Sequence, residues 1–210
     1  MAQNSKQVTL ARSEVDRRCH VCAFFHSRED EYKVMLPFLK EGLEAGEKVF
    51  QIIDQRQRAE RLRRLTDAGV DAAAAEQNGL LEVRSWENAH LSDGRFDQHA
   101  MIALVEGIAK DGEKRSGVTR LWANMEWALE DFPGVHDLLE YESRINYMLP
   151  KYDMATVCTY DLAKFSAAIV MDVLRTHPKV IVGGILRENP FYVPPDEFLR
   201  DLRDRGSAAH

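Results

Sequence analysis

The stretch RCHVCAFF, residues 18–25, is short and apolar and lacks the regular polar alternation of a half-exposed strand. Runs of this kind are typical of strands that are buried on both faces of a sheet. Comparable runs occur at residues 48–53, 118–125, 155–160 and 179–182, and an extra strand is expected near residues 80–84, after Gly79. The chain therefore predicts a central sheet whose strands are mostly buried.

Helical periodicity fills the stretches between these runs. Apolar residues recur three and four positions apart between residues 32 and 43, as on the buried face of a helix. Ser27 and Asp30 resemble a capping box before this helix, and Gly46 would end it. Further helices are expected at residues 57–68, 96–108, 135–149 and 162–175. Alternating strands and helices predict a single-domain, three-layer α/β fold, with a mainly parallel central sheet flanked by helices.

Composition and charge indicate a single domain and limit its partners. With 210 residues and 45% hydrophobic content, the chain can bury one core without disulfides. A net charge of -6 argues against nucleic-acid binding, because phosphate contacts need clustered Lys and Arg. No apolar run approaches the roughly 20 residues of a membrane span, so we expect a cytoplasmic protein with no membrane partner. We expect the folded domain over residues 17–205, with flexible termini at 1–16 and 206–210.

The turn after the first predicted strand lacks a phosphate-binding loop. Residues 25–30, FHSRED, contain no Gly or Lys, and Glu29, Asp30 and Glu31 put negative charge where phosphate would bind. The missing glycines also argue against a dinucleotide or S-adenosylmethionine site. No G-x-S-x-G motif or Ser/His/Asp grouping in recognisable context is present. We therefore expect that the protein is not an enzyme and needs no cofactor.

Aromatic and polar residues follow the predicted strands and could line a pocket. Ligands of open parallel sheets bind beyond the carboxyl ends of the strands. A mostly apolar pocket with a few polar groups suits a small organic ligand. The candidate ligand-binding residues are Phe25, His26, Asp54, Glu126, Trp127, Glu142, Tyr160 and Asp161.

Glu142 stands out because it lies in the apolar stripe of the predicted helix 135–149. A buried carboxylate is costly unless it is paired or hydrogen-bonded. One interpretation is a structural partner such as Arg120 or a strand-end N–H group. The other is that Glu142 lines the pocket beside Glu126.

Several segments, read in order, resemble one known family, the MEDS or methanogen/methylotroph, DcmR-type sensory domain. They are HVCAFF at 20–25, PFLKEGLEAGE at 37–47, DGRF at 93–96, MEWAL at 125–129, YE at 141–142, VCTYD at 157–161, LRTHP at 174–178 and NPFYVPP at 189–195. The resemblance covers about residues 17–199 and rests on the order and spacing of these pieces.

The resemblance implies a RecA/KaiC-like fold without a nucleotide loop, in a protein of signalling or transcription regulation that senses small hydrocarbon-type compounds. It places His20, Cys22, Trp127, Glu142, Cys158, Asp161 and His177 at characteristic positions of the family. Cys19 looks particular to this chain. Family members often carry a DNA-binding or histidine-kinase module, for which 210 residues leave no room.

The three cysteines suggest an alternative site. Cys19 and Cys22 have C-x-x-C spacing, but residues three apart on a strand point to opposite faces. His20 and Cys22 share a face, Cys158 would lie beside them in a RecA-like strand order, and His177 is a fourth possible ligand. This set could bind zinc or another transition metal. The competing interpretation is that these are ordinary core residues.

These observations lead to three hypotheses. The first is a stand-alone sensory domain that binds a small, largely apolar ligand at the strand ends and signals through a protein partner, such as a kinase or regulator. The second is a metal- or redox-responsive regulatory domain that uses the His and Cys residues. The third is a degenerate ATPase-fold interaction module without a ligand, in which residues 189–195 form a docking segment. A homodimer is compatible with each hypothesis.

Overall fold

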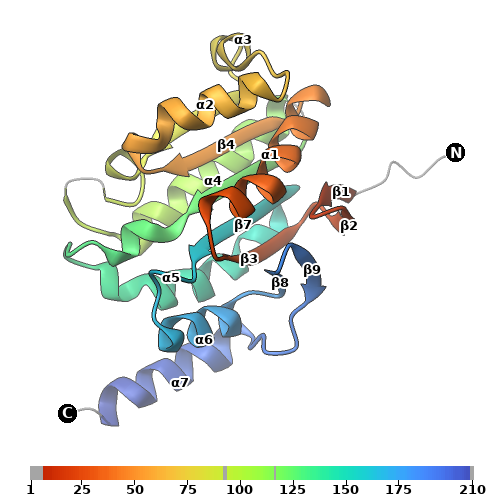
Figure 1. Ribbon diagram of the computed structural model, residues 1–210. Helices are drawn as coiled ribbons and strands as arrows, with labels where there is room; N and C mark the ends of the chain where they lie inside the picture. The colour runs from red at the N-terminus through yellow and green to blue at the C-terminus, as the bar shows by residue number, and fades with distance from the viewer. Residues whose placement is uncertain (1–6, 92–93, 116, 209–210) are drawn as a thin grey trace, which may run out of the picture.

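The computed structural model describes residues 7–91, 94–115 and 117–208, and its centre is a seven-stranded sheet (Figure 1). The strands run in the order β5-β4-β6-β7-β3-β8-β9. Their bounds are β3 (Cys19–Phe25), β4 (Lys48–Ile53), β5 (Leu81–Ser85), β6 (Thr119–Asn124), β7 (Met154–Asp161), β8 (Lys179–Val182) and β9 (Ile185–Glu188). All neighbouring pairs are parallel except β8 and β9. The predicted mainly parallel sheet is confirmed.

Helices cover both faces of this sheet (Figure 1). They are α1 (Arg28–Glu44), α2 (Arg58–Asp67), α3 (Ala72–Gln77), α4 (Gln98–Arg115), α5 (Leu138–Arg144), α6 (Ala167–Thr176) and α7 (Pro195–Ala208). The side chains of α1 and α2 pack in one hydrophobic cluster and those of α4 and α5 in another. The sheet separates these clusters, which confirms the three-layer α/β architecture.

Strand β3 shows why the sequence folds in this way. All seven of its residues are buried. Val21 and Ala23 join the cluster under α1, whereas Cys22 and Phe24 join the cluster under α4 and α5. Because the side chains alternate, His20 lies on the same face as Cys22. An unbroken apolar run is therefore the pattern that this central strand requires.

The start and end of α1 follow the predicted capping pattern. The Ser27 hydroxyl accepts a hydrogen bond from the Asp30 N–H at 3.2 Å. Gly46, just past the helix, has φ of +74°, a conformation that glycine adopts without strain. This helix positions Arg28 and Glu31 over the end of β3.

The expectation of flexible termini is wrong for the described parts of both ends. Residues 7–16 form an antiparallel hairpin of β1 (Gln7–Leu10) and β2 (Ser13–Asp16), whose Val8, Leu10 and Val15 are buried. Residues 206–208 belong to α7. Residues 1–6 and 209–210 lie outside the described residues, as does Asp93 of the quoted DGRF segment.

Two predicted helices also differ from the structure. The helix expected over residues 135–149 is split into α5 and short 3-10 turns on either side of it. The helix expected from residue 162 begins only at Ala167, where Ser166 caps it by accepting from the Ile169 N–H. Leu162 and Phe165 are apolar because they pack on the core from a turn.

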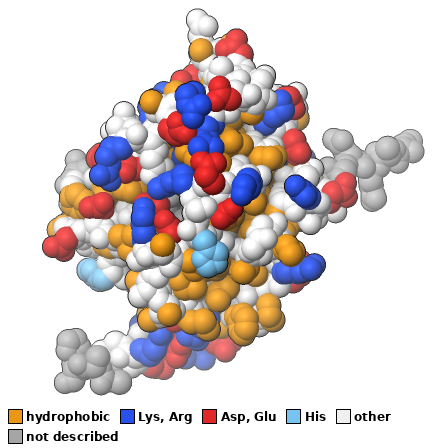
Figure 2. Space-filling view, viewed as in Figure 1, with side chains coloured by type: hydrophobic (Ala, Val, Ile, Leu, Met, Phe, Trp, Pro, Cys, Tyr) orange, Lys and Arg blue, Asp and Glu red, His pale blue; other side chains and the backbone are white. Residues whose placement is uncertain are grey.

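The face shown in Figure 2 carries one charged area and one hydrophobic area. Charged side chains crowd the area of α1 and α2, whereas hydrophobic side chains gather near β8, β9 and α6. Val182, Ile185 and Met171 are each more than half exposed there. Among the described residues, no helix combines the length and the hydrophobicity that crossing a membrane requires.

Candidate functional site

The crevice at the strand ends is almost closed. Its cavity of about 10 Å³ is lined by Phe25, Glu126, Tyr160 and Asp161, among others. Arg28 donates to Glu126 Oε1 at 3.1 Å, and Lys164 donates to Glu126 Oε2 at 2.5 Å. These ion pairs bridge the crevice and leave room for about one water molecule.

The remaining residues predicted for this pocket are dispersed. Trp127 is fully buried and stacks on His90, with ring centroids 4.5 Å apart. Asp54 accepts hydrogen bonds from the backbone and side chain of Arg56. His26 is exposed and lines a separate groove beside α1. The eight predicted residues therefore do not form one pocket.

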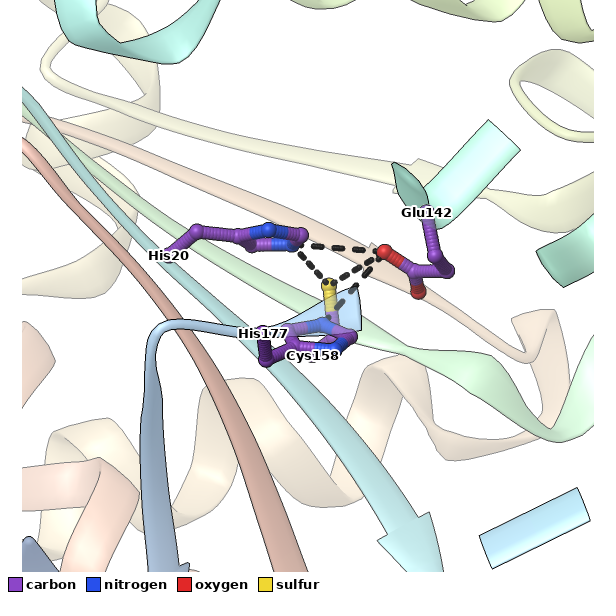
Figure 3. Close-up of side chains that lie close together, drawn as sticks. All are labelled: His20, Glu142, Cys158 and His177. Carbon is purple, nitrogen blue, oxygen red and sulfur yellow. Dashed lines mark hydrogen bonds and ion pairs between the residues drawn. The ribbon is translucent and has the colours of Figure 1, made fainter. Parts of the chain in front are cut away.

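Glu142 instead belongs to a cluster buried between the sheet and α5 (Figure 3). Its Oε2 lies 3.3 Å from His20 Nε2 and 3.4 Å from His177 Nε2. Cys158 Sγ lies 3.6 Å from His20 Nε2 and 3.8 Å from Glu142 Oε2. The side chains come from β3, α5, β7 and the residue after α6, and none of the four residues is more than 3% exposed.

Neighbouring groups fix the histidine rings. The Asn146 amide nitrogen donates to the carbonyls of Glu142, Ser143 and Thr176, so its oxygen must face His20 Nδ1, 3.0 Å away. His20 Nδ1 therefore carries a proton. His177 Nδ1 lies 2.9 Å from the carbonyl of Val173, which can only accept. Both rings consequently turn an Nε2 lone pair toward Glu142 when they are neutral.

The cluster thus has more acceptors than donors. Two imidazole lone pairs and Glu142 Oε2 converge, and the Cys158 thiol is the one group of the four that can donate when the histidines are neutral. His177 Nε2 has no hydrogen-bond partner among the described residues. Burial of unpartnered acceptors is costly, and either a proton or a metal ion between these atoms would remove that cost.

Electrostatics favour an ionised Glu142. Burial alone would raise its pKa, but the charge and N–H groups of His177 and His20 in their protonated forms outweigh that effect and hold the pKa well below its ordinary value. Tyr160 donates to Glu142 Oε1 at 2.6 Å, which also stabilises the carboxylate. The pKa of His20 is lowered by burial and by His177, against the opposing influence of Glu142, so neutral imidazole is favoured.

The distances fit a tetrahedral metal site. Zinc binds N and O ligands at about 2.0–2.2 Å and S at about 2.3 Å, which places adjacent ligands of a tetrahedron about 3.3–3.6 Å apart. The four distances above range from 3.3 to 3.8 Å. The four potential ligand atoms all lie within 4.8 Å of one another. Little movement would be needed to coordinate an ion.

Two sequence-based expectations need correction here. Cys22 lies opposite Cys158 in the sheet, but its thiol points to the Lys179 carbonyl at 3.7 Å, and Glu142 takes the fourth position of the cluster. Arg120, the suggested partner of Glu142, donates instead to Glu47 and to the Phe38 carbonyl. Sequence reasoning missed Asn146, although it lies one helical turn after Glu142 and so shares its face.

The described residues form a three-layer α/β domain with a mainly parallel sheet. Two solved structures from Pyrococcus horikoshii share the fold. A KaiC-like protein has a TM-score of 0.56 at 15% identity, covering 78% of this chain and 69% of its own. An uncharacterized protein in complex with an unknown peptide has a TM-score of 0.58 at 19% identity, covering 78% and 76%.

A family model described as "MEthanogen/methylotroph, DcmR Sensory domain" matches residues 19–178. The chain therefore belongs to the MEDS family of sensory domains. It is also 26% identical over 178 residues to the transcriptional repressor DcmR of Methylorubrum extorquens. That match covers 83% of this chain and 64% of DcmR, so the chain spans less than two thirds of that relative.

Proposed function

We propose that this sensory domain responds to a transition metal ion, with zinc as the best match, bound by His20, Glu142, Cys158 and His177. The convergence of two buried imidazole nitrogens and one thiol on a single carboxylate oxygen, Glu142 Oε2, carries this proposal. A divalent cation would satisfy all three acceptors and displace the thiol proton, because a coordinated thiol is deprotonated. Coordination by the protein at all four tetrahedral positions is typical of a non-catalytic zinc site, which favours a sensor over an enzyme.

The surroundings support metal binding over thiol redox chemistry. Burial raises the pKa of Cys158 well above its ordinary value, and a thiol is a poor nucleophile without an activating group. Metal-bound histidines usually donate their other ring N–H to a carbonyl or carboxylate. His20 and His177 both have such a partner, in the Asn146 side chain and the Val173 carbonyl.

Metal analysis of the untagged protein tests this proposal. We expect close to one zinc per chain, and one saturable Co²⁺ site with a thiolate charge-transfer band after zinc is removed. Cys158→Ser should remove the band and weaken binding at least tenfold. Cys22→Ser is the matched control, because it alters a neighbouring buried thiol outside the cluster. This variant should keep both the charge-transfer band and the metal affinity. Folded protein that binds neither ion would refute the proposal.

Binding of a small, largely apolar ligand at the strand ends is a second candidate, supported by the aromatic residues there. The crevice is bridged by Arg28, Glu126 and Lys164, so binding requires these side chains to separate. Glu126→Gln should weaken both ion pairs and increase the uptake of a small apolar probe such as toluene. Equal uptake by both proteins, measured by calorimetry, would contradict this candidate.

We also propose that the output is regulatory and passes through a protein partner. DcmR, a relative over most of this chain, is by name a transcriptional repressor. Pull-down from extract with zinc-loaded and with chelator-treated protein tests this output. Capture of a true partner should differ between the two forms, and Cys158→Ser protein should not capture it.

A further inference from the structure

A groove of about 780 Å³ runs along α1, apart from the metal cluster. Its ends are the turn between β1 and β2 and the turn between β8 and β9, and Phe25 and His26 form its floor. Figure 1 shows the β1–β2 hairpin beside β9, which is the edge strand of the sheet. Volumes of about 300–1,000 Å³ are typical of small-molecule sites.

The walls of this groove are largely apolar. Val34, Pro37 and Phe38 of α1 face Ile185 of β9 across it. Ile185 is 53% exposed, so about half of this apolar side chain is open to solvent. Hydrophobic side chains are also visible in this region of Figure 2. The groove thus offers an apolar ligand a large surface.

The charged side chains at the rim of the groove restrict the charge that a ligand can carry. Lys33 is paired with Asp30 at 2.9 Å, and Glu41 lies 3.8 Å from Arg120. Arg12 lines the groove and makes no ion pair with any described residue. Its guanidinium is therefore free to bind a carboxylate through two parallel hydrogen bonds. Asp30 and Glu41 would repel a doubly charged phosphate.

The backbone at Arg12 is strained, whereas the equivalent position in the β8–β9 hairpin is a glycine, Gly184, and is not strained. Both hairpins have two-residue loops, because Leu10 pairs with Ser13 and Val182 pairs with Ile185. Two-residue loops of type I′ have positive φ at both positions. Gly183 and Gly184 fit this pattern with φ of 58° and 75°, whereas Ala11 and Arg12 adopt φ of 50° and 61°. A strained residue at the rim of a groove indicates a functional constraint.

We propose that this groove is a second binding site, for a small organic monocarboxylate with an apolar body. The carboxylate pairs with Arg12, and the body lies against Phe25, Pro37, Phe38 and Ile185. The strained turn holds the guanidinium over the groove. This groove is distinct from the proposed metal site, and ligand binding in the groove does not depend on metal binding.

Calorimetry and saturation-transfer NMR with 3-phenylpropanoate test the proposal on the full chain, in chelator so that metal has no part. We expect one saturable site. Arg12→Gln should weaken binding at least tenfold, as should replacing the probe by 3-phenylpropan-1-ol. Ile185→Asp should abolish binding by placing a charge in the groove. Arg63→Gln, an exposed arginine of α2 outside the groove, is the matched control and should bind normally.

A double variant separates loss of the site from loss of the fold. Ala11→Asn with Arg12→Gly introduces the Asn-Gly pair that suits this loop, so we expect a higher Tm together with lost binding, whereas Ala11→Asn alone should retain binding. Several outcomes would overturn the proposal: no saturable binding, equal affinity for the alcohol and the acid, tighter binding of 3-phenylpropyl phosphate, or equal weakening by Arg63→Gln.

Discussion

Tyr160 shows how one hydroxyl group can control a buried charge. Its O–H donates to Glu142 Oε1 at 2.6 Å, leaving Oε2 to face both histidines. Tyr160 does not contact the proposed ion, and it acts by orienting a ligand. Such outer partners commonly change metal affinity 10–100-fold when they are removed.

Replacing Tyr160 by Phe should therefore weaken zinc affinity by roughly tenfold or more, because Glu142 loses its orienting donor. Competition with a chromophoric chelator measures this change. Tyr152→Phe is the control, since that hydroxyl donates to Glu106 on α4, away from the cluster. Equal zinc affinities for Tyr160→Phe and the unmodified protein would contradict the positioning role of Tyr160.

His90 is a buried titratable residue outside the metal cluster. It is 1% exposed and stacks on Trp127, and neither of its ring nitrogens has a hydrogen-bond partner among the described residues. Burial lowers its pKa from 6.5 to about 3, against a weak opposing effect of Glu142. The folded protein therefore holds His90 neutral at pH values where the unfolded chain binds a proton.

This difference predicts acid sensitivity. Between pH 6.5 and about 3 the unfolded state binds the extra proton, so the free energy of unfolding should fall by about 1.4 kcal/mol for each pH unit of acidification. His90→Phe keeps the aromatic stack and should flatten this slope in urea unfolding experiments. His136→Gln, at an exposed site, should leave the slope unchanged. Identical slopes for His90→Phe and the unmodified protein would rule out this assignment.

At the scale of elements, close packing of backbone segments depends on particular glycines. Gly134 has φ of +87°, and a Cβ there would lie 2.2 Å from the carbonyl oxygen of Phe96. This contact brings the turn before α5 against the segment that carries Phe96, whose ring packs on Trp127. Gly107 in α4 differs, because a Cβ added there would meet no described atom within 4 Å.

These two glycines should respond to alanine in opposite directions. Gly134→Ala should lower the free energy of unfolding by about 2 kcal/mol or more, because it combines backbone strain with a clash. Gly107→Ala should raise it by about 0.5–1 kcal/mol, because alanine favours an exposed helix position. Urea unfolding measures both changes. A stabilising Gly134→Ala variant would show that this turn can move.

The elements that the sequence predicted best are the buried ones. The strands at residues 48–53 and 179–182 coincide with β4 and β8, since a short unbroken apolar run is typical of a buried strand. β9 is mostly exposed and carries no such run. The hairpin of residues 7–16 escaped prediction because Ala11 and Arg12 are not the Asn or Gly residues that signal such a turn.

The candidate site was predicted only in part. His20, Cys158 and His177 were grouped correctly, because parallel strand order places Cys158 beside β3. Glu142 was recognised as a costly buried charge, but its partners come from distant segments that spacing along the chain does not reveal. The alternation of β3 put Cys22 on the correct face, and only the structure shows that its thiol points elsewhere.

At the scale of the whole molecule, the proposed metal site joins segments from both ends of the chain. It links β3, α5 and β7 with the residue that lies two positions before β8. An ion that binds these groups only in the folded state stabilises the whole domain and not just one element.

Zinc at a hundred times its dissociation constant should stabilise the fold by about 2.7 kcal/mol, equivalent to a rise in Tm of roughly 5–10 °C for a chain of this size. Calorimetric melts with zinc and with chelator measure the difference. Cys158→Ser protein should show a smaller difference between the two buffers, because its zinc affinity is lower. Equal melting temperatures for the unmodified protein would argue against a site formed on folding.

Strand β8 begins two residues after His177 and ends directly before Gly183 of the groove. One short strand therefore touches both proposed binding sites. Coupling between two such sites is reciprocal by thermodynamic linkage: the factor by which a carboxylate changes zinc affinity is the factor by which zinc changes carboxylate affinity. A domain with two coupled sites would respond to the concentrations of zinc and of the carboxylate together, and not to either one alone.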